Sequence, residues 1–296
     1  MKFSDFLQLK RWLVPLLMRP RVAHAIKYSV YAGLLLMFAS YIRDDLLAFR
    51  STLPPDASTL DVILTFSTTI DMFGWVALVV LFELETYAIS EAAWTQGTER
   101  TIHVLRILCY VMVGWAAYGY TVESLETYDV SPIAGVSTAC DLADQGIWMQ
   151  LDVIEYVEIS AENCDDLSDE TVFYTIKGEV AAIGASVLEH TRAMGWVDIL
   201  NAYVWIIVVL LIEAEVRLAG ADRFSSPVVK LVRQSKTIFY LVLIANSLIW
   251  LYYGYYTYTI DAWLWIFGFW VIEYNLKEWR DEIDHADEGQ ALNEAS

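Results

Sequence analysis

The sequence predicts an all-α integral membrane protein with six transmembrane helices, arranged as three pseudo-repeated antiparallel hairpins, and a small α/β extracytoplasmic domain between the third and fourth helices. Three observations predict this fold: a very apolar composition, six long apolar stretches and a motif that recurs three times. Of the 296 residues, 57% are hydrophobic and 19% are charged, whereas soluble globular chains are about 45–50% apolar and about 25% charged. The composition therefore indicates a multi-pass protein surrounded by membrane lipid.

The net charge of the chain bears on whether it binds nucleic acid. The chain has 19 Lys and Arg against 38 Asp and Glu, a net charge of −19. Binding to nucleic acid requires a clustered basic surface, and the sequence contains no basic block. We therefore expect no nucleic-acid partner.

A helix that crosses a bilayer needs about 17–25 mainly apolar residues. Six stretches meet or approach this requirement: Ile26–Ile42, Val62–Tyr87, Ile102–Tyr120, Val197–Val216, Thr237–Gly254 and Ala262–Leu276. The domain boundaries follow from them. We expect an interfacial amphipathic helix over 1–25, three transmembrane helices over 26–125, an acidic extracytoplasmic domain over 126–195, three more helices over 196–277 and an acidic cytoplasmic tail over 278–296.

The distribution of Lys and Arg predicts the orientation, because cytoplasmic segments retain positive charge. With the N-terminus inside, only four of the 19 basic residues fall outside: Arg43, Arg50, Lys177 and Arg192. We therefore expect a protein of the cell inner (plasma) membrane with both termini in the cytoplasm.

The extracytoplasmic segment has its own sequence features. It carries 14 acidic and 2 basic residues, and Gln150–Ser160 alternates as a strand does, while Val180–Met194 is compatible with a helix. Cys140 and Cys164 both lie in it, so we expect a disulfide in an oxidising compartment. The acidic run Glu162–Glu170 lacks the spacing of a calcium loop, which favours a solvated turn, and no metal site is predicted.

The second, fourth and sixth predicted helices share the pattern [DN]-x3-W-x7-E-x-[EN]. Its members are Asp71, Trp75, Glu83 and Glu85; Asn201, Trp205, Glu213 and Glu215; and Asp261, Trp265, Glu273 and Asn275. The odd helices begin with related basic positions: His24 and Lys27, His103 and Arg106, and Arg233 and Lys236. Three matches at one offset indicate an internal repeat whose unit is a hairpin.

At about 100° per residue, Asp71, Trp75 and Glu85 share one stripe of their helix, and Glu83 lies off it. One hypothesis is that this stripe and its equivalents line an ion pathway, since acids inside a membrane commonly face water or a partner. The pathway candidates are then Asp71, Glu85, Asn201, Glu215, Asp261, Asn275, Trp75, Trp205 and Trp265, with Glu83, Glu213 and Glu273 held by the basic residues.

The same residues have a structural interpretation. Ion pairs between acids and bases of neighbouring helices stabilise a bundle without any transport role, and Glu85 and Glu215 are equally compatible with hydration at the cytoplasmic interface. The three Trp residues are compatible with an interfacial aromatic belt, as are Tyr41, Tyr120 and Tyr253.

Together these patterns favour a protein that moves ions or small solutes, as a cation channel or cation-coupled transporter. The alternative is a non-transporting scaffold or sensor subunit that docks a partner through its acidic outer domain, and assembly as a homo-oligomer is compatible with both. No cofactor is predicted. The four His residues are scattered and there is no G-x-S-x-G, H-E-x-x-H or P-loop motif, so we expect no enzymatic activity. A membrane enzyme that uses carboxylates alone is the remaining alternative to this expectation.

Overall fold

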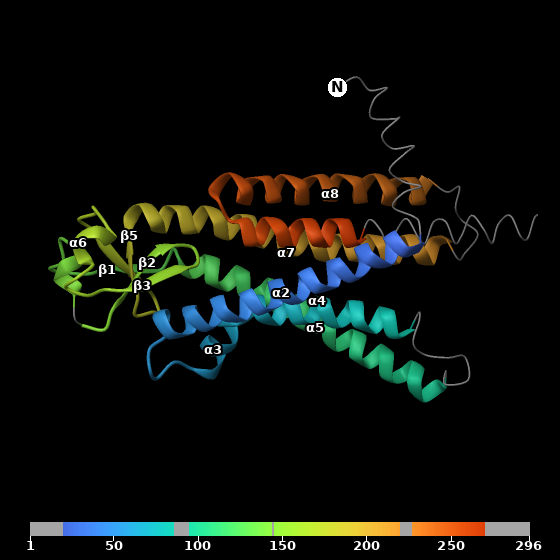
Figure 1. Ribbon diagram of the computed structural model, residues 1–296, viewed down its shortest axis with the longest axis horizontal. Helices are drawn as coiled ribbons and strands as arrows, with labels where there is room; N and C mark the ends of the chain where they lie inside the picture. The colour runs from blue at the N-terminus through green and yellow to red at the C-terminus, as the bar shows by residue number, and fades with distance from the viewer. Residues whose placement is uncertain (1–19, 86–94, 144, 220–226, 270–296) are drawn as a thin grey trace, which may run out of the picture. The chain divides into compact units, whose positions relative to one another are not determined.

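The computed structural model describes residues 20–85, 95–143, 145–219 and 227–269. The chain is mostly helical (Figure 1). The helices of the bundle are α2 (Pro20–Thr52), α3 (Thr59–Thr65), α4 (Ser67–Glu83), α5 (Gln96–Glu126), α7 (Ala185–Ala219) and α8 (Pro227–Tyr253), and residues 256–269 are helical after a turn at Gly254.

Four of these helices are long and apolar enough to cross a membrane. They are Ala25–Thr52, Gln96–Glu126, Ala185–Glu215 and Pro227–Tyr253, and a fifth span results if α3 and α4 are counted together. These segments contain the first and third predicted spans and all but the last residue of the fourth and fifth, and the bent pair contains most of the second. The sixth prediction, Ala262–Leu276, is only partly within the described residues.

Local sequence signals explain where the first helices end and begin. α2 ends at Thr52, two residues before Pro54, whose ring cannot continue a helix. α3 begins with a capping box, in which the Ser58 hydroxyl accepts from the Asp61 N–H at 3.2 Å and the Asp61 carboxylate accepts from the Ser58 N–H at 2.9 Å. This reciprocal pair satisfies two N–H groups that the helix itself leaves free.

Residues 127–184 form a separate small unit, here called the sheet domain. Its five strands have the order β1-β4-β5-β2-β3, and only the β2–β5 pair is parallel. The strands are β1 (Val130–Pro132), β2 (Trp148–Asp152), β3 (Glu155–Glu158), β4 (Phe173–Ile176) and β5 (Ala182–Gly184). Met149, Ile159 and Phe173 form its core together with the short helices η3 (Ala139–Leu142) and α6 (Cys164–Leu167).

Two details of this domain differ from the sequence prediction. Gln150–Ser160 is not one strand but the hairpin of β2 and β3, because the Asp152 carboxylate accepts from the Val153 N–H at 2.8 Å and turns the chain. The helix predicted over Val180–Met194 starts only at Ala185, after β5, and continues without a break into the following span as α7.

The chain divides into two compact units. One comprises 1–37 and 243–296, and the other comprises Phe38–Val242. Within the described part of the first unit, the rings of Trp250 and Tyr258 pack at 5.7 Å between centroids across the turn at Gly254. This unit thus contains two helices that follow one another across a tight turn.

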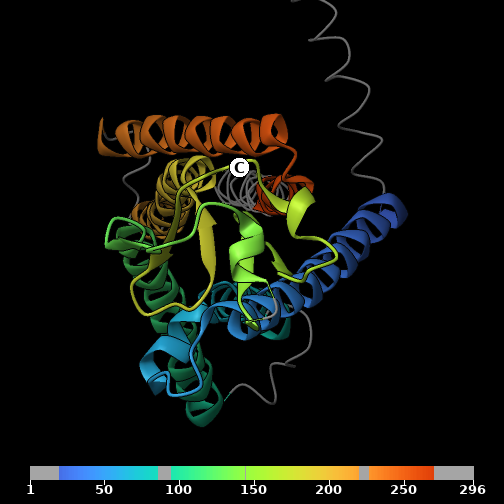
Figure 2. The same cartoon turned by 90° about the vertical axis from the view of Figure 1, so that its left-hand side faces the viewer.

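In the second unit α5 packs between α4 and α7 (Figure 1). The contact of α5 with α7 depends on a small residue, because a Cβ atom added to Gly195 would lie 2.5 Å from the Ser124 Oγ. The sheet domain covers one end of α5 and α7, as the view along the helices shows (Figure 2). We call this the sheet-domain end and the other the far end.

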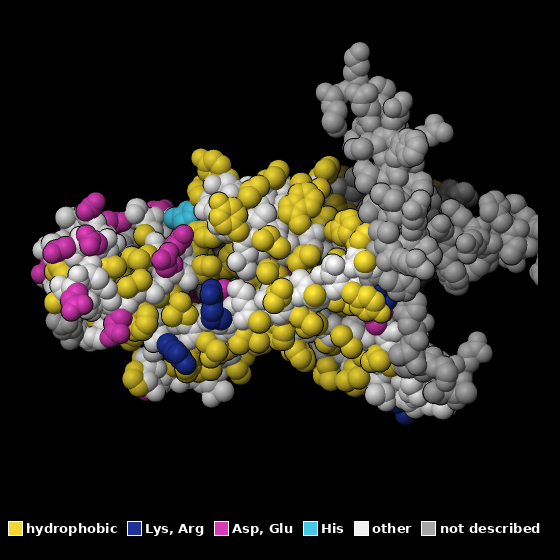
Figure 3. Space-filling view, viewed as in Figure 1, with side chains coloured by type: hydrophobic (Ala, Val, Ile, Leu, Met, Phe, Trp, Pro, Cys, Tyr) yellow, Lys and Arg dark blue, Asp and Glu magenta, His cyan; other side chains and the backbone are white. Residues whose placement is uncertain are grey.

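The two kinds of surface are distinct (Figure 3). On the face shown, acidic side chains gather on the sheet domain, whereas apolar side chains cover the helices. Large apolar residues point outward along several helices, for example Leu36, Ile107, Leu210 and Leu241. Such extensive exposed apolar surface is unsuited to water and is compatible with a membrane protein.

Candidate functional site

A break in the second predicted span defines the site. The chain bends by 61° between α3 and α4, and Phe66 at the break makes no side-chain cap. The Ser67 hydroxyl donates to the Leu64 carbonyl at 2.6 Å, which satisfies one backbone group at the bend. Gly119 of α5 lies directly against it, because a Cβ there would be 2.0 Å from the Ser67 Oγ. Close packing by a glycine therefore holds the bend.

A carboxylate from another helix caps the N-terminus that this break creates. Asp45 of α2 accepts a hydrogen bond from the Thr69 N–H at 2.8 Å, and the side chains of Thr68 and Thr69 lie beside it. Asp45 is only 7% exposed. A helix N-terminus carries partial positive charge and free N–H groups, which explains how a carboxylate is held at this buried position.

Asp71, on the next turn of α4, is joined to α5. The Tyr120 hydroxyl donates to the Asp71 carboxylate at 3.3 Å. Tyr120 is also close enough to Asp45 and Glu123 to feel their charges. The Tyr120 side chain thus lies among the carboxylates of three helices and is not an interfacial belt residue.

Glu123 of α5 extends this group toward the sheet domain. The charged groups that act most strongly on it are all carboxylates: Asp45, Glu179, Glu126 and Asp198. In the part of the chain that the structure describes, its own carboxylate has no hydrogen-bond or ion-pair partner. We call Asp45, Asp71, Glu123, Glu179 and Asp198 the acid cluster.

Glu179 is the member that the sheet domain contributes. The residue as a whole is only partly buried, but enough protein surrounds its carboxyl group to raise the pKa to about 7, and the charge of Glu126 adds to this. Burial also raises the pKa of Tyr156 on β3, followed by the charges of Glu179 and Glu123. The cluster therefore reaches from the helices into the sheet domain.

Aromatic side chains of the repeat motif pack against one another further along the helices. The rings of Trp75 on α4 and Trp205 on α7 meet edge to face at 6.4 Å, and Tyr240 of α8 packs on Trp205 at 6.5 Å. Trp75 is 9% exposed, and Trp205 and Trp265 are each 7% exposed. The rings of these three residues are therefore covered by protein.

Asn201 lies one turn before Trp205 on α7. Its side-chain Oδ1 is buried and has no hydrogen-bond partner among the described residues. Buried polar atoms are nearly always hydrogen-bonded to protein or water.

At the far end the acids of the motif are paired. Arg106 of α5 bonds to Glu85, while Arg233 and Lys236 of α8 both bond to Glu215 at 2.8 Å. Glu85 and Glu215, predicted from the sequence to line the pathway or to be hydrated, are thus in contact with bases. The pairing of Glu83 and Glu213 with these bases stays a prediction.

The pairing itself repeats. Glu85 bonds to Arg106 and Glu215 to Lys236, and the two partners are 21 residues apart in both cases. Glu85 and Glu215 occupy the same position of the first two motif copies.

The remaining candidates are distributed as follows. Asp261 and Trp265 belong to the other compact unit, and Lys27 lies over the Tyr31 ring at 5.8 Å from its centroid. The His103 Nδ1 is 2.9 Å from the Glu99 carbonyl oxygen of its own helix. Glu273 and Asn275, the His24 side chain and most of the predicted interfacial helix and tail lie outside the described residues.

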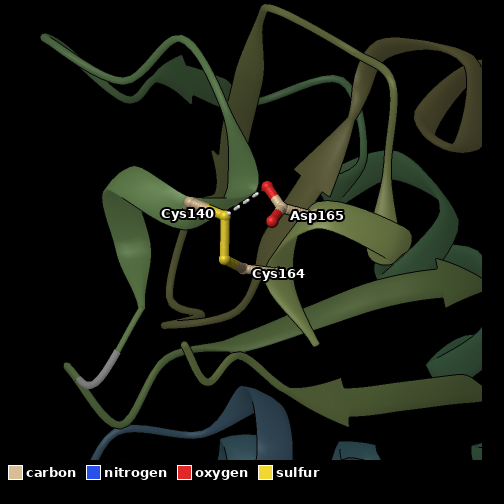
Figure 4. Close-up of side chains that lie close together, drawn as sticks. All are labelled: Cys140, Cys164 and Asp165. Atoms are coloured by element: carbon tan, nitrogen blue, oxygen red, sulfur yellow. Dashed lines mark hydrogen bonds between the residues drawn. A yellow bond between two sulfur atoms is a disulfide. The ribbon is translucent and has the colours of Figure 1, made fainter. Parts of the chain in front are cut away.

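The predicted disulfide is confirmed. Cys140 of η3 and Cys164 of α6 are joined, and the Asp165 carboxylate lies 3.2 Å from the Cys140 sulfur (Figure 4). Both sulfurs are used in this bond, so they cannot serve as thiolate ligands for a metal while it is intact. The bond links the two short helices over the sheet-domain core.

Comparison with known proteins adds no relative: no protein-family model, curated protein sequence or solved structure matches the chain. The function is therefore inferred from the geometry of the site.

Sequence reasoning missed three parts of this site. It treated Val62–Tyr87 as one unbroken helix, although the polar run Thr65–Thr69 interrupts the apolar pattern. It placed Asp45 beyond the end of the first span and Glu123 between the third span and the outer domain. Asp45 and Glu123 each follow an apolar stretch within a few residues, and this position was the available signal for them.

Proposed function

We propose that this protein is a multi-pass protein of the cell inner membrane that moves cations, as a cation-coupled transporter or cation channel, with the acid cluster as the cation-binding region. The observation that carries the proposal is the bend between α3 and α4, with Asp45 bound at the new helix end. Irregular backbone inside a membrane is tolerated where it is buried in protein or lines a water-filled cavity. Transporters place their binding sites at such broken helices.

The charges at the break favour a cation over an anion. One carboxylate, Asp45, already occupies the positive N-terminus of α4. Asp71 and Glu123 then add negative charge close by. A site with several carboxylates and a single helix N-terminus attracts positive ions.

The Trp75 and Trp205 pair is the proposed closure of the path. These buried rings lie one turn further along their helices than Asp71 and Asn201, so hydration that reaches the acid cluster ends at them. Transport then requires that the rings separate, as gating elements do.

The proposed topology has six spans in three hairpins, the sheet domain outside and both termini in the cytoplasm. The shared spacing of the Glu85–Arg106 and Glu215–Lys236 pairs supports the hairpin repeat. The disulfide supports an oxidising location for the sheet domain. The excess of Lys and Arg in the opposite segments supports the same orientation.

Flux through liposomes tests the proposal. The purified protein is reconstituted, and the movement of H⁺, Na⁺ and K⁺ is followed under imposed gradients. We expect flux above that of protein-free liposomes, reduced at least tenfold by Asp45→Asn and by Asp71→Asn. The matched control is Asp169→Asn, which removes a carboxylate from an exposed position of the sheet domain. Folded, monodisperse protein that conducts none of these ions would overturn the proposal.

One observation favours the alternative, a non-transporting scaffold or sensor subunit. The ion pairs of Glu85 and Glu215 stabilise the bundle without requiring a path, and the sheet domain presents many acids to a partner (Figure 3). Capture of one defined protein by the sheet domain, together with an absence of flux, supports this function.

A further inference from the structure

We propose that the contact between the sheet domain and the ends of α2 and α5 is a proton-controlled switch, in which protonation of Glu179 tightens the contact and its ionisation loosens it. This inference stands on the geometry of the contact and does not depend on transport. Its effector is the proton concentration in the water on the sheet-domain side.

The contact is made by the turn between β4 and β5. The Val180 N–H donates to the carbonyl of Thr52, the last residue of α2, at 2.7 Å. Beside it the Lys177 N–H donates to the Asp129 carbonyl at 2.9 Å. Thr52 and Ala181 are buried, with exposures of 5% and 3%. The backbone of the turn is therefore tied to the end of α2, while the Val180 side chain is 41% exposed.

Glu179 sits within this turn, directly before the residue that bonds to α2. Its carboxyl group has no hydrogen-bond or ion-pair partner among the described residues. Every described charged group that acts strongly on it or on its neighbour Glu123 is acidic. Glu126 at the end of α5 acts on Glu179. Asp45 of α2, Glu126 of α5 and Asp198 of α7 act together with Glu179 on Glu123.

The basic residues nearby do not neutralise it. Lys177, on the same turn, is exposed and bonds to Asp129 at 2.7 Å. Its charge acts on Glu126, which lies at the end of α5. Arg192 of α7 bonds to the Thr127 carbonyl and to Glu189. A charge on Glu179 therefore enters a region that is already negative.

The sign of the effect follows from the raised pKa of Glu179, which is about 7 against an ordinary value of 4.5. When the turn leaves the helices, the carboxyl group becomes hydrated and its pKa returns toward the ordinary value. The stabilisation of the contact is then complete below about pH 4.5 and is lost as the pH rises to about 7. Above that the contact changes no further, because the group is ionised in both states.

Amide hydrogen exchange of the full-length protein in nanodiscs tests the switch. Protection of the segment that contains Val180 is measured from pH 4.5 to 8 and corrected for the intrinsic pH dependence of exchange. We expect protection in the wild type to fall on the order of a hundredfold over this window, since each unit of pKa difference corresponds to a factor of ten. Glu179→Gln should remain protected throughout. Glu155→Gln, at an exposed position of β3, is the matched control and should behave as the wild type.

A second variant keeps the test decisive if Glu179→Gln does not fold. Glu126→Gln removes the neighbouring charge that raises the pKa of Glu179, so the midpoint of the protection change should move to lower pH. Protection that is independent of pH in the wild type, or a midpoint that Glu126→Gln leaves unchanged, would overturn the proposal.

Discussion

Carboxylates have opposite surroundings at the two ends of the helices. At the far end, Glu215 lies between Arg233 and Lys236, and Glu85 is bonded to Arg106. At the sheet-domain end, Glu123 is surrounded by other carboxylates. The far end satisfies its acids with bases of the neighbouring helix, whereas the sheet-domain end gathers acids against their mutual repulsion.

This difference indicates which residues stabilise the fold and which are placed for another reason. Paired acids contribute to stability and need no ligand. A carboxylate that lies among other carboxylates, as Glu123 does, costs free energy, and such costs are characteristic of functional sites. The contrast therefore predicts that identical Glu→Gln substitutions will change stability with opposite signs at the two ends.

The largest effect is expected for Glu215→Gln. The side chains of Glu215 and Lys236 are 14% and 13% exposed, so the substitution leaves a nearly buried ammonium without its counter-charge. Removing one partner of a buried pair costs 3–5 kcal/mol, and the exposure of Arg233 reduces this here to about 2 kcal/mol. The free energy of unfolding in detergent measures it, and Glu215→Gln combined with Lys236→Gln should recover part of the loss.

A smaller loss of the same sign is expected for Glu85→Gln. The side chains of Arg106 and Glu85 are 31% and 33% exposed, and water screens such pairs, so the expected cost is about 0.5–1 kcal/mol. High salt should shrink the difference from the wild type. A loss equal to that of Glu215→Gln would mean that burial does not set the strength of the far-end pairs.

Glu123→Gln should have the opposite sign. The substitution removes repulsion from Asp45, Glu179 and Asp198 and keeps the shape of the side chain. We expect the free energy of unfolding at pH 8 to rise by about 0.5–1 kcal/mol, which is the usual size of an effect from partly exposed charges. A decrease in stability would show that the ionised carboxylate is satisfied, and the comparison of the two ends would fail.

The smallest effect is expected for Lys177→Gln on the sheet domain. Lys177 and Asp129 form an ion pair whose side chains are 74% and 63% exposed. Exposed pairs commonly contribute nothing measurable, so the unfolding midpoint should stay unchanged. This variant gives the baseline against which the paired and unpaired acids of the helices are compared.

Part of the fold could be predicted from patterns within short stretches of the sequence. Apolar length predicted the regions of the spans, and two cysteines within one acidic segment predicted the Cys140–Cys164 bond. The acids of the motif and the basic positions of the odd helices predicted ion pairs between helices, and the structure shows such pairs for Glu85 and Glu215. Angles on an ideal helix do not reveal which acid a long Arg or Lys side chain reaches.

Contacts between distant segments could not be predicted in this way. The bend at Phe66 depends on the absence of a side chain at Gly119, and its cap comes from Asp45. Neither residue belongs to the apolar stretch that bends. The burial of Trp75 and Trp205 depends on α4 and α7 facing one another, which hydropathy does not determine.

The most direct test of the central claim is an experimental density map of the wild-type protein in lipid nanodiscs at neutral pH. We predict a bend between α3 and α4 and ordered water or cation density between the carboxylates of Asp45, Asp71 and Glu123. A dry contact filled by side chains or lipid, or a straight helix through Phe66, would contradict the claim.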